Sequence, residues 1–248
     1  MQNIILNDCG VDISTTTIHR KLVGMKFSLK RLELSPIRRN TESTIDLRYN
    51  YAADFINLQN QFSDDQFFFL DEVGFSLSLR KTMGRSRIGE HAISQVSTIR
   101  SKNLSYCAAM SVGGIFYYKK SDTPYNTEKL VDFVKGFIRN LAESNITSGV
   151  IVLDNVRFHH SIKVAEELGQ TNFTLLFLPP YSPFLNIIEN GFSKWKNSVI
   201  NLKPTNEDKL IEYINNAASF FTITDFQGYF RNMLRYISRS LLREEIHQ

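Results

Sequence analysis

Residues 66–72 contain the run Gln66-Phe67-Phe68-Phe69-Leu70-Asp71-Glu72. Apolar residues that follow one another without polar alternation are typical of a strand buried on both faces of a sheet. The acid after Leu70 indicates that this strand ends where the chain meets solvent or a polar site. We therefore expect a central strand whose last residue, Asp71, presents a carboxylate at the edge of the sheet.

The segments on either side of this run extend the sheet. A second apolar run, residues 149–153, also ends in an acid, Asp154. Strand patterns at 105–111, 114–119 and 173–178 alternate with helical patterns at 127–143, 161–168 and 186–199. The order strand, strand, strand, helix, strand, helix, strand, helix predicts an α/β fold with a mixed sheet flanked by helices. It is the order of the ribonuclease H-like fold.

The composition fits a protein with a real core: hydrophobic residues make up 42% of the chain and charged residues 22%. The net charge of +4 and pI near 9.0 mildly favour an anionic partner. The two cysteines have no zinc-ligand spacing, the N-terminus does not read as a signal peptide, and no apolar stretch could cross a membrane. We expect an intracellular protein, nuclear if the host is eukaryotic.

Three acids stand where they can meet. Asp71 and Asp154 follow strand patterns, and Glu189 lies on the helix after the next strand, with 34 residues between Asp154 and Glu189. Carboxylates that converge repel one another unless a cation holds them, and Mg²⁺ prefers such oxygen ligands. On position alone, however, the same residues fit two ordinary strand-end acids and a first-turn helix acid.

The surrounding residues favour the metal-binding interpretation. Leu70-Asp71-Glu72-Val73-Gly74-Phe75, Asp154-Asn155 and the block 178–190, Leu-Pro-Pro-Tyr-Ser-Pro-Phe-Leu-Asn-Ile-Ile-Glu-Asn, resemble the three catalytic blocks of mariner-like DDE transposases. The family pattern is close to L-P-P-Y-S-P-x-L-N-P-I-E, and the 34-residue spacing matches one branch of it. The chain departs from the pattern at Ile187, where Pro is usual, and at Phe184, where an acid is frequent. Neither departure removes a metal ligand.

The resemblance implies an activity and its site. Asp71, Asp154 and Glu189 would be the catalytic residues and the ligands of two Mg²⁺ ions, for which Mn²⁺ could substitute. The reaction would be strand cleavage at transposon ends followed by strand transfer into target DNA, by a chain that acts as a homodimer in the DNA complex. Asn155 would orient Asp154 or contact the DNA. Glu72 is left out, because alternation along a strand turns it away from Asp71.

Basic residues indicate further DNA contacts. Segment 80–102 has a net charge of +5 and is either a DNA-gripping loop or a solvated one. Lys194 and Lys196 follow Glu189 by one to two helical turns, whereas Trp195 reads as core. His159 is either a DNA contact or, with His160, a surface histidine pair. The expected DNA-binding residues are Arg80, Lys81, Arg85, Arg87, Asn155, His159, Lys194, Lys196, Arg20 and Lys21.

The two ends of the chain have their own patterns. Residues 2–9 and 15–23 predict two helices around a turn at Gly10, with Ser14 as the cap of the second. This is either a helix-turn-helix that contacts DNA through Arg20 and Lys21 or an ordinary helical hairpin. In the C-terminal helix, Arg231, Arg235, Arg239 and Arg243 form a stripe that is either DNA-binding or simply solvated.

We therefore predict three domains. Residues 1–50 form a truncated helix-turn-helix segment and basic linker, 51–204 the ribonuclease H-like catalytic domain, and 205–248 a helical tail. With so little of a helix-turn-helix unit, we expect weak DNA binding with little sequence preference. Two alternatives stay open: a domesticated or decayed relative that binds DNA without cutting it, and a ribonuclease H-like nuclease, which the P-P-Y-S-P block disfavours.

Overall fold

The computed structural model describes residues 2–28, 30, 34–79, 85–93, 103–156 and 162–247. The chain divides into two compact units, Met1–Ser35 with His247–Gln248, and Pro36–Ile246. The domain boundaries predicted at 50/51 and 204/205 fall inside the larger unit. The functional division that they express stays a prediction.

The small unit holds the two predicted helices, α1 (Gln2–Cys9) and α2 (Thr15–Gly24). Gly10 takes a positive φ of 67° between them, a conformation that favours glycine. Ser14 caps α2 by accepting a hydrogen bond from the Thr17 amide at 3.2 Å. No residue that the structure describes in this unit is buried, so the helix pair has no core of its own.

The large unit is built on a mixed five-stranded sheet in the order β3-β2-β1-β4-β5. Strands β1, β4 and β5 run parallel to one another, whereas β2 pairs antiparallel with both β1 and β3. This confirms the predicted mixed sheet and its order along the chain. The strand bounds are β1 Phe67–Phe75, β2 Leu104–Ser111, β3 Gly114–Ser121, β4 Ser148–Leu153 and β5 Asn172–Phe177.

The first strand is longer than predicted. We expected it to end at Asp71, but β1 continues to Phe75 because its antiparallel pairing with β2 extends to the pair Phe75–Leu104. What ends at Leu70 is the parallel pairing with β4, whose last pair is Leu70–Leu153. Asp71 is therefore at the end of a ladder rather than at the end of a strand.

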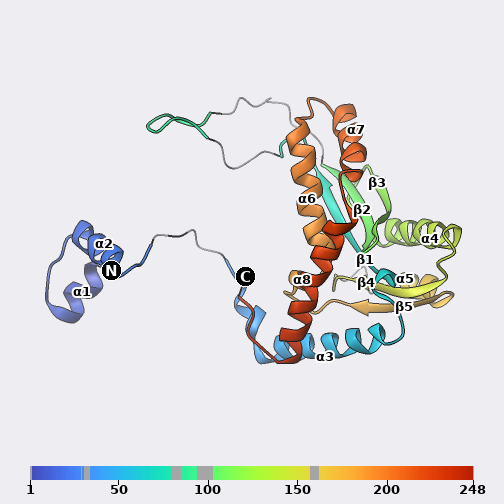
Figure 1. The fold of residues 1–248 in the computed structure, drawn as a ribbon, viewed down its shortest axis with the longest axis horizontal. Coiled ribbons are helices and arrows are strands. Elements are labelled where there is room, and N and C mark those ends of the chain that lie inside the picture. Colours follow the sequence, from blue (N-terminus) through green and yellow to red (C-terminus); the bar gives the residue numbers. More distant parts are fainter. Residues whose placement is uncertain are drawn as a thin grey trace. The chain divides into compact units, whose positions relative to one another are not determined.

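Helices cover both faces of the sheet (Figure 1). On one face α4 (Thr127–Glu143) and α5 (Ile162–Gly169) pack on Phe68, Leu70 and Ile151. On the other, α6 (Ile187–Leu202), α3 (Glu42–Gln59) and α8 (Ile223–Leu241) enclose a larger core around Phe69 and Trp195. The remaining elements are α7 (Glu207–Ala218) and the short 3₁₀ helices η1 (Ile37–Asn40), η2 (Asp64–Gln66) and η3 (Pro183–Leu185).

The C-terminal helices belong to this second core. Trp195 of α6 is fully buried and donates its indole N–H to the Ile214 carbonyl of α7 at 2.8 Å, which confirms the prediction that it is a core residue. α8 packs against α3, α6 and η3. None of the helices in the described residues is both long and apolar enough to cross a membrane.

Candidate active site

The strand register places Asp71 and Asp154 side by side. Each follows directly on one member of the last parallel pair, Leu70–Leu153. Neighbouring strands lie roughly 4.8 Å apart, so residues at matching positions are close. Leu70 and Leu153 both face the core under α4 and α5, and alternation turns the next residue of β1 to the opposite face, where α6 lies. The two acids therefore meet at one edge of the sheet, beside α6.

The third acid comes from the start of α6. Asn186 caps this helix by accepting a hydrogen bond from the Ile188 amide at 3.3 Å, which fixes where the helix begins. Glu189 then falls in the first turn, near the positive end of the helix dipole. The buried residues Ile187 and Ile188 anchor this turn in the core below α6. The helix start thus sets the position of Glu189 relative to β1.

All three acids line one open cleft of about 280 Å³. The other walls come from Asn155 and Asn186 and from the segment that follows β5, residues 178–183. Tyr181 in that segment has a left-handed backbone, with φ of 56°, and a side chain exposed at the rim. Ser182 stabilises the turn by donating its hydroxyl to the Pro180 carbonyl at 3.0 Å. The Leu-Pro-Pro-Tyr-Ser-Pro block is therefore a wall of the cleft.

Asp71 has two hydrogen bonds from neighbours. One carboxylate oxygen accepts from the Glu72 amide at 2.7 Å, and the other accepts from the Asn186 side-chain amide at 3.4 Å. The pKa of Asp71 is raised to about 8, mainly by burial; the hydrogen bond from the Glu72 amide lowers it, and the charges of Glu72, Asp154 and Glu189 raise it. Asp71 is thus a carboxyl group whose charge is costly unless a cation is present.

Glu189 is electrostatically coupled to the same cluster. Desolvation in the cleft raises the pKa of Glu189, the positive charge of Lys196 lowers it, and the charge of Asp154 raises it. Asp154 accepts a hydrogen bond from the Val156 amide at 3.1 Å, which orients its carboxylate in the turn after β4. The three carboxylates therefore influence one another, as members of a single site do.

The carboxylates of the cleft are oxygen ligands of the kind that hard divalent cations prefer. Within the described ranges, no three His, Cys, Asp or Glu side chains lie close enough together to hold one ion. Mg²⁺ in phosphoryl-transfer sites takes only one or two carboxylates and completes its shell with water and substrate phosphates. Paired carboxylates from this cleft therefore fit such ions, whereas a closed cage of three would not be expected.

The side chain of Glu72 is on the other face of the sheet from Asp71, as strand alternation predicted. It is paired in the sheet with Cys107, which packs with Leu70 in the core under α4. Burial raises the pKa of Cys107 well above its usual range, and the charge of Glu72 adds to this. Glu72 thus interacts with the face of the sheet opposite to the acid cluster.

The structure places the other predicted contact residues in different ways. Asn155 lines the cleft, and Lys196 is close enough to Glu189 to affect its pKa. Lys194 is held by Asp225 at 2.5 Å and lies over the Phe221 ring, so it fastens α6 to the start of α8. Arg85, Arg87, Arg20 and Lys21 are exposed, whereas Arg80, Lys81 and His159 lie outside the described residues.

Asn186 is the site residue that the sequence analysis did not assign. It belongs to the third motif block, and it joins the helix that carries Glu189 to the carboxylate of Asp71. The signal was present in the sequence, because an Asn directly before a helix is a favoured cap. Its second contact, to Asp71, could not be predicted because it spans 115 residues.

Comparisons with known proteins bear on the fold and on the family. No curated protein matches the chain. Among solved structures, the Mos1 transposase paired-end complex with left transposon end superposes with a TM-score of 0.79 at 14% identity, over 99% of this chain and 78% of that one. The Mos1 strand transfer complex gives 0.77 at 15% identity, over 100% and 78%. The catalytic domain of Mos1 mariner transposase gives 0.62 at 12% identity, over 89% and 100%.

At these identities the solved structures establish the fold, which is the predicted ribonuclease H-like one. The family is shown by a different comparison, since the family model described as DDE superfamily endonuclease matches residues 66–211, more than half of the chain. That range contains Asp71, Asp154 and Glu189 together with the walls of the cleft. The chain belongs to the DDE superfamily endonucleases.

Proposed function

We propose that this chain is a transposase of the mariner type, which cleaves DNA strands at transposon ends and transfers them into target DNA. The observation that supports the proposal most is the cleft. Asp71, Asp154 and Glu189 come from three separate motif blocks and line the same open cavity beside the end of the parallel ladder. An open cleft can admit a long DNA strand, and divalent cations bound to its acids would offset their repulsion of the phosphates.

In this proposal Asp71, Asp154 and Glu189 hold two divalent ions, Mg²⁺ or in its place Mn²⁺. Such ions stabilise the attacking and leaving oxygens of an in-line displacement at phosphorus. The raised pKa of Asp71 supports this role, because a carboxyl group that is costly to ionise alone gains most from a neighbouring cation. Solved Mos1 complexes are described with Mn and with Mg.

The residues around the acids serve orientation and binding. Asn186 holds the Asp71 carboxylate and the first turn of α6 in register. Asn155 and Tyr181 stand on the cleft wall, where they can contact the DNA on either side of the scissile phosphate. Lys196 supplies a positive charge beside Glu189, which suits a phosphate that approaches the cleft.

The partners follow from the reaction. The substrates are transposon-end DNA and target DNA, and we propose that two copies of the chain act together, so that each of the two ends has an active site of its own. The place of action is intracellular, and the nucleus in a eukaryotic host. Arg20, Lys21, Arg85 and Arg87 are exposed and are proposed DNA contacts. Arg80, Lys81 and His159 are also proposed DNA contacts. Lys194 could contact DNA only after its ion pair with Asp225 breaks.

A nicking assay tests the proposal. Supercoiled plasmid is incubated with the full chain and Mg²⁺, Mn²⁺, Ca²⁺ or EDTA, and nicked product is measured. We expect nicking with Mg²⁺ and Mn²⁺ only, lost in Asp154→Asn. Nicking that survives in EDTA or in Asp154→Asn would contradict it.

The same assay separates the proposal from its rivals. A DNA-binding protein without chemistry would shift the plasmid in a gel without nicking it under any metal. A ribonuclease H-like nuclease would cut an RNA–DNA hybrid in preference to a DNA duplex of the same sequence. We expect duplex DNA to be the better substrate.

A further inference from the structure

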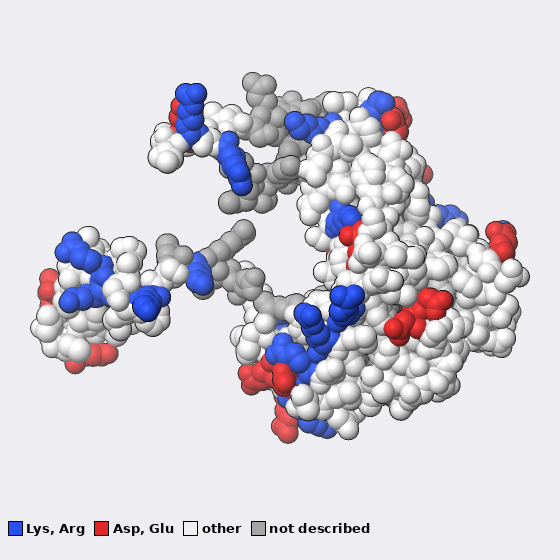
Figure 2. Space-filling view, in the orientation of Figure 1, with Lys and Arg blue, Asp and Glu red and all other residues white. Residues whose placement is uncertain are grey.

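The surface formed by α8 and the start of α3 is unusually basic. Residues 36–48 and 231–246 together contain seven arginines, no lysine and four acids. Figure 2 shows Lys and Arg side chains gathered over the C-terminal half of α8 and the adjoining start of α3. We name the exposed arginines Arg231 and Arg235 the α8 basic patch.

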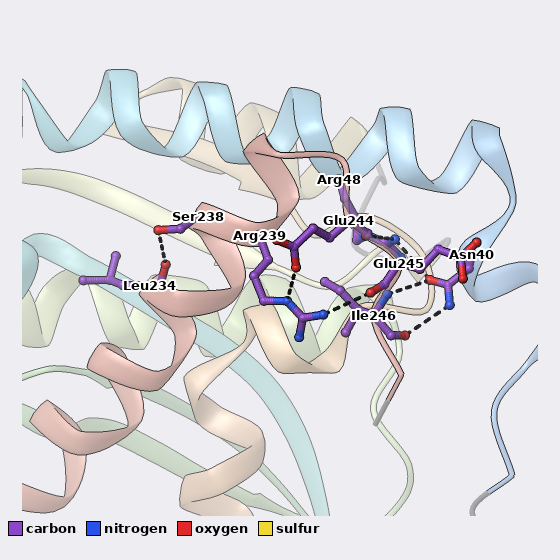
Figure 3. Close-up of polar contacts among 8 residues, drawn as sticks. All are labelled: Asn40, Arg48, Leu234, Ser238, Arg239, Glu244, Glu245 and Ile246. Atoms are coloured by element: carbon purple, nitrogen blue, oxygen red, sulfur yellow. Dashed lines mark hydrogen bonds and ion pairs between the residues drawn. The ribbon is translucent and has the colours of Figure 1, made fainter.

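The acids nearby are already used by other arginines. Arg239 pairs with Glu244 at 2.6 Å and also donates to the Glu245 carbonyl at 3.0 Å (Figure 3). Arg243 pairs with Asp46 and lies over the Tyr49 ring, 4.4 Å from its centroid. These two residues of the C-terminal arginine stripe therefore hold the end of the chain in place. Their charges are largely neutralised within the protein.

The other two stripe residues are different. Arg231 and Arg235 are exposed, and neither has a hydrogen bond or ion pair with any residue that the structure describes. They are one helical turn apart, about 6 Å along the axis. The stripe is thus divided: its C-terminal half is structural, and its N-terminal half presents two uncompensated guanidinium groups.

Arg39, on η1, adds a buried positive charge next to Arg48, whose pKa is also lowered by Arg239 of the stripe. The Arg39 side chain is only 9% exposed, and its Nε and Nη1 have no hydrogen-bond partner among the described residues. The neighbouring Arg48 is fully buried and pairs with no carboxylate among the described residues; it donates instead to the Arg39 carbonyl at 2.6 Å, the Asn40 side chain at 3.2 Å and the Glu244 carbonyl at 3.4 Å. Burial lowers the pKa of Arg48, and the positive charges of Arg39 and Arg239 lower it further. The excess positive charge at this end of the unit favours an anion at the exposed arginines above it.

The patch is joined to the catalytic cleft by a short structural path. Pro183 lines the cleft, and the next residue, Phe184, packs its ring on Tyr236 of α8 with 4.9 Å between centroids. Arg48 also lies over the Phe184 ring, 6.0 Å from its centroid. A DNA strand that leaves the cleft over η3 would therefore meet α8 next.

We propose that the α8 basic patch binds the sugar-phosphate backbone of duplex DNA next to the stretch that occupies the catalytic cleft. Arginine guanidinium groups can bond phosphate oxygens in pairs. The spacing of roughly 6 Å between Arg231 and Arg235 along the helix is close to the rise of two nucleotides in one strand, about 6.8 Å. Such contacts set the position of the duplex without reading its sequence. The inference deepens the proposed function by naming the surface that holds the substrate.

Binding is measured separately from cleavage, so that the two proposals can fail independently. Fluorescence anisotropy of a labelled duplex of mixed sequence is recorded in EDTA at several salt concentrations. We compare the full chain with Arg231→Gln/Arg235→Gln, and with a triple variant that adds Arg39→Gln. The matched control is Arg139→Gln/Lys163→Gln, which removes two exposed charges from α4 and α5 on the opposite face of the sheet.

The double variant should raise the Kd about tenfold or more and lower the log–log salt slope by up to about 2, since each lost phosphate contact removes about 0.9. The control should change neither value by that amount, and circular dichroism should show both proteins folded. If the double variant keeps the wild-type affinity and salt slope, or if the control weakens binding equally, the proposal is wrong. The triple variant also replaces the buried Arg39. If it does not fold for that reason, the double variant alone decides the test. A protein that binds through the patch but never nicks DNA would refute only the proposed function.

Discussion

Asn186 donates its side-chain amide to Asp71 across 3.4 Å, while its side-chain oxygen caps the helix that carries Glu189. One residue thus connects two acids that are far apart in sequence. The contact also explains why the third motif block needs an amide: it has one group that donates to a carboxylate and one that accepts from a backbone amide.

Substitution of Asn186 should separate these two roles. Asn186→Ala loses both the contact to Asp71 and the helix cap. We expect its free energy of unfolding to be lower by about 1 kcal/mol and its DNA cleavage to be slower. Asn186→Asp keeps an effective cap but places a fourth negative charge beside Asp71, so its stability should be near wild type in Mg²⁺ while cleavage falls. Urea unfolding and the nicking rate measure the two effects. Equal rates in wild type and Asn186→Asp would show that the amide contact to Asp71 is unimportant.

The raised pKa of Asp71 predicts how stability depends on pH without metal. Between the ordinary value of 3.8 and the folded value of about 8, the folded protein keeps a proton that the unfolded chain has released. The free energy of unfolding should therefore fall as the pH rises from about 4 to about 8, and each pKa unit corresponds to about 1.4 kcal/mol. The raised pKa of Glu189 acts in the same direction.

Asp71→Asn cannot ionise at this position, so its stability should fall less over that range. Denaturant unfolding in EDTA at a series of pH values measures the difference between the two proteins. Excess Mg²⁺ near pH 8 should stabilise the wild type and leave Asp71→Asn nearly unchanged. A difference between wild type and variant that stays constant with pH would contradict the assigned burial of Asp71.

Two glycines offer a matched test of the packing. A Cβ at Gly149 would lie 2.6 Å from the Gln66 carbonyl oxygen, a backbone atom that cannot move aside easily. Gly149→Ala should therefore destabilise the protein by about 1–3 kcal/mol. At Gly228, inside α8, nothing lies within 4 Å, so Gly228→Ala should stabilise by about 0.5–1 kcal/mol through helix propensity. Thermal unfolding of both variants checks the pair, and the same sign for both would be inconsistent with the structure.

The small unit should contribute little to the stability of the large one. No described residue in Met1–Ser35 is buried, whereas the unit Pro36–Ile246 has both cores. A fragment that begins at Pro36 should melt within about 2 °C of the full chain. A drop of more than about 5 °C in differential scanning calorimetry would show that the helix pair supports the catalytic unit.

The parts of the fold that follow local rules could be predicted from the sequence. The apolar runs before Asp71 and Asp154 predicted two buried strands, and Ser14 predicted the start of α2. The extension of β1 to Phe75 could not be predicted, because it depends on pairing with β2, which begins at Leu104. A strand boundary set by a partner so far away in sequence leaves no local signal.

The candidate site shows the same division. The motif blocks predicted which three acids line the cleft. The DNA contact of Lys194 stays a prediction, but its ion pair with Asp225, a residue of the capping box of α8, was not predicted. The arginine stripe was read as one surface, yet Arg239 and Arg243 are held by Glu244 and Asp46 while Arg231 and Arg235 are not. Such pairings depend on how the C-terminal segment folds back onto α3, which periodicity alone does not show.

The central claim is that Asp71, Asp154 and Glu189 form one metal-dependent active site. Its most direct test is DNA nicking by Asp71→Asn, Asp154→Asn and Glu189→Gln, each of which keeps the side-chain shape and removes the anionic ligand. Each variant should fold, bind the labelled duplex about as well as wild type in EDTA, and lose Mg²⁺-dependent nicking by about 10³-fold or more. Nicking at more than about a tenth of the wild-type rate in the Asp154→Asn protein would contradict this account.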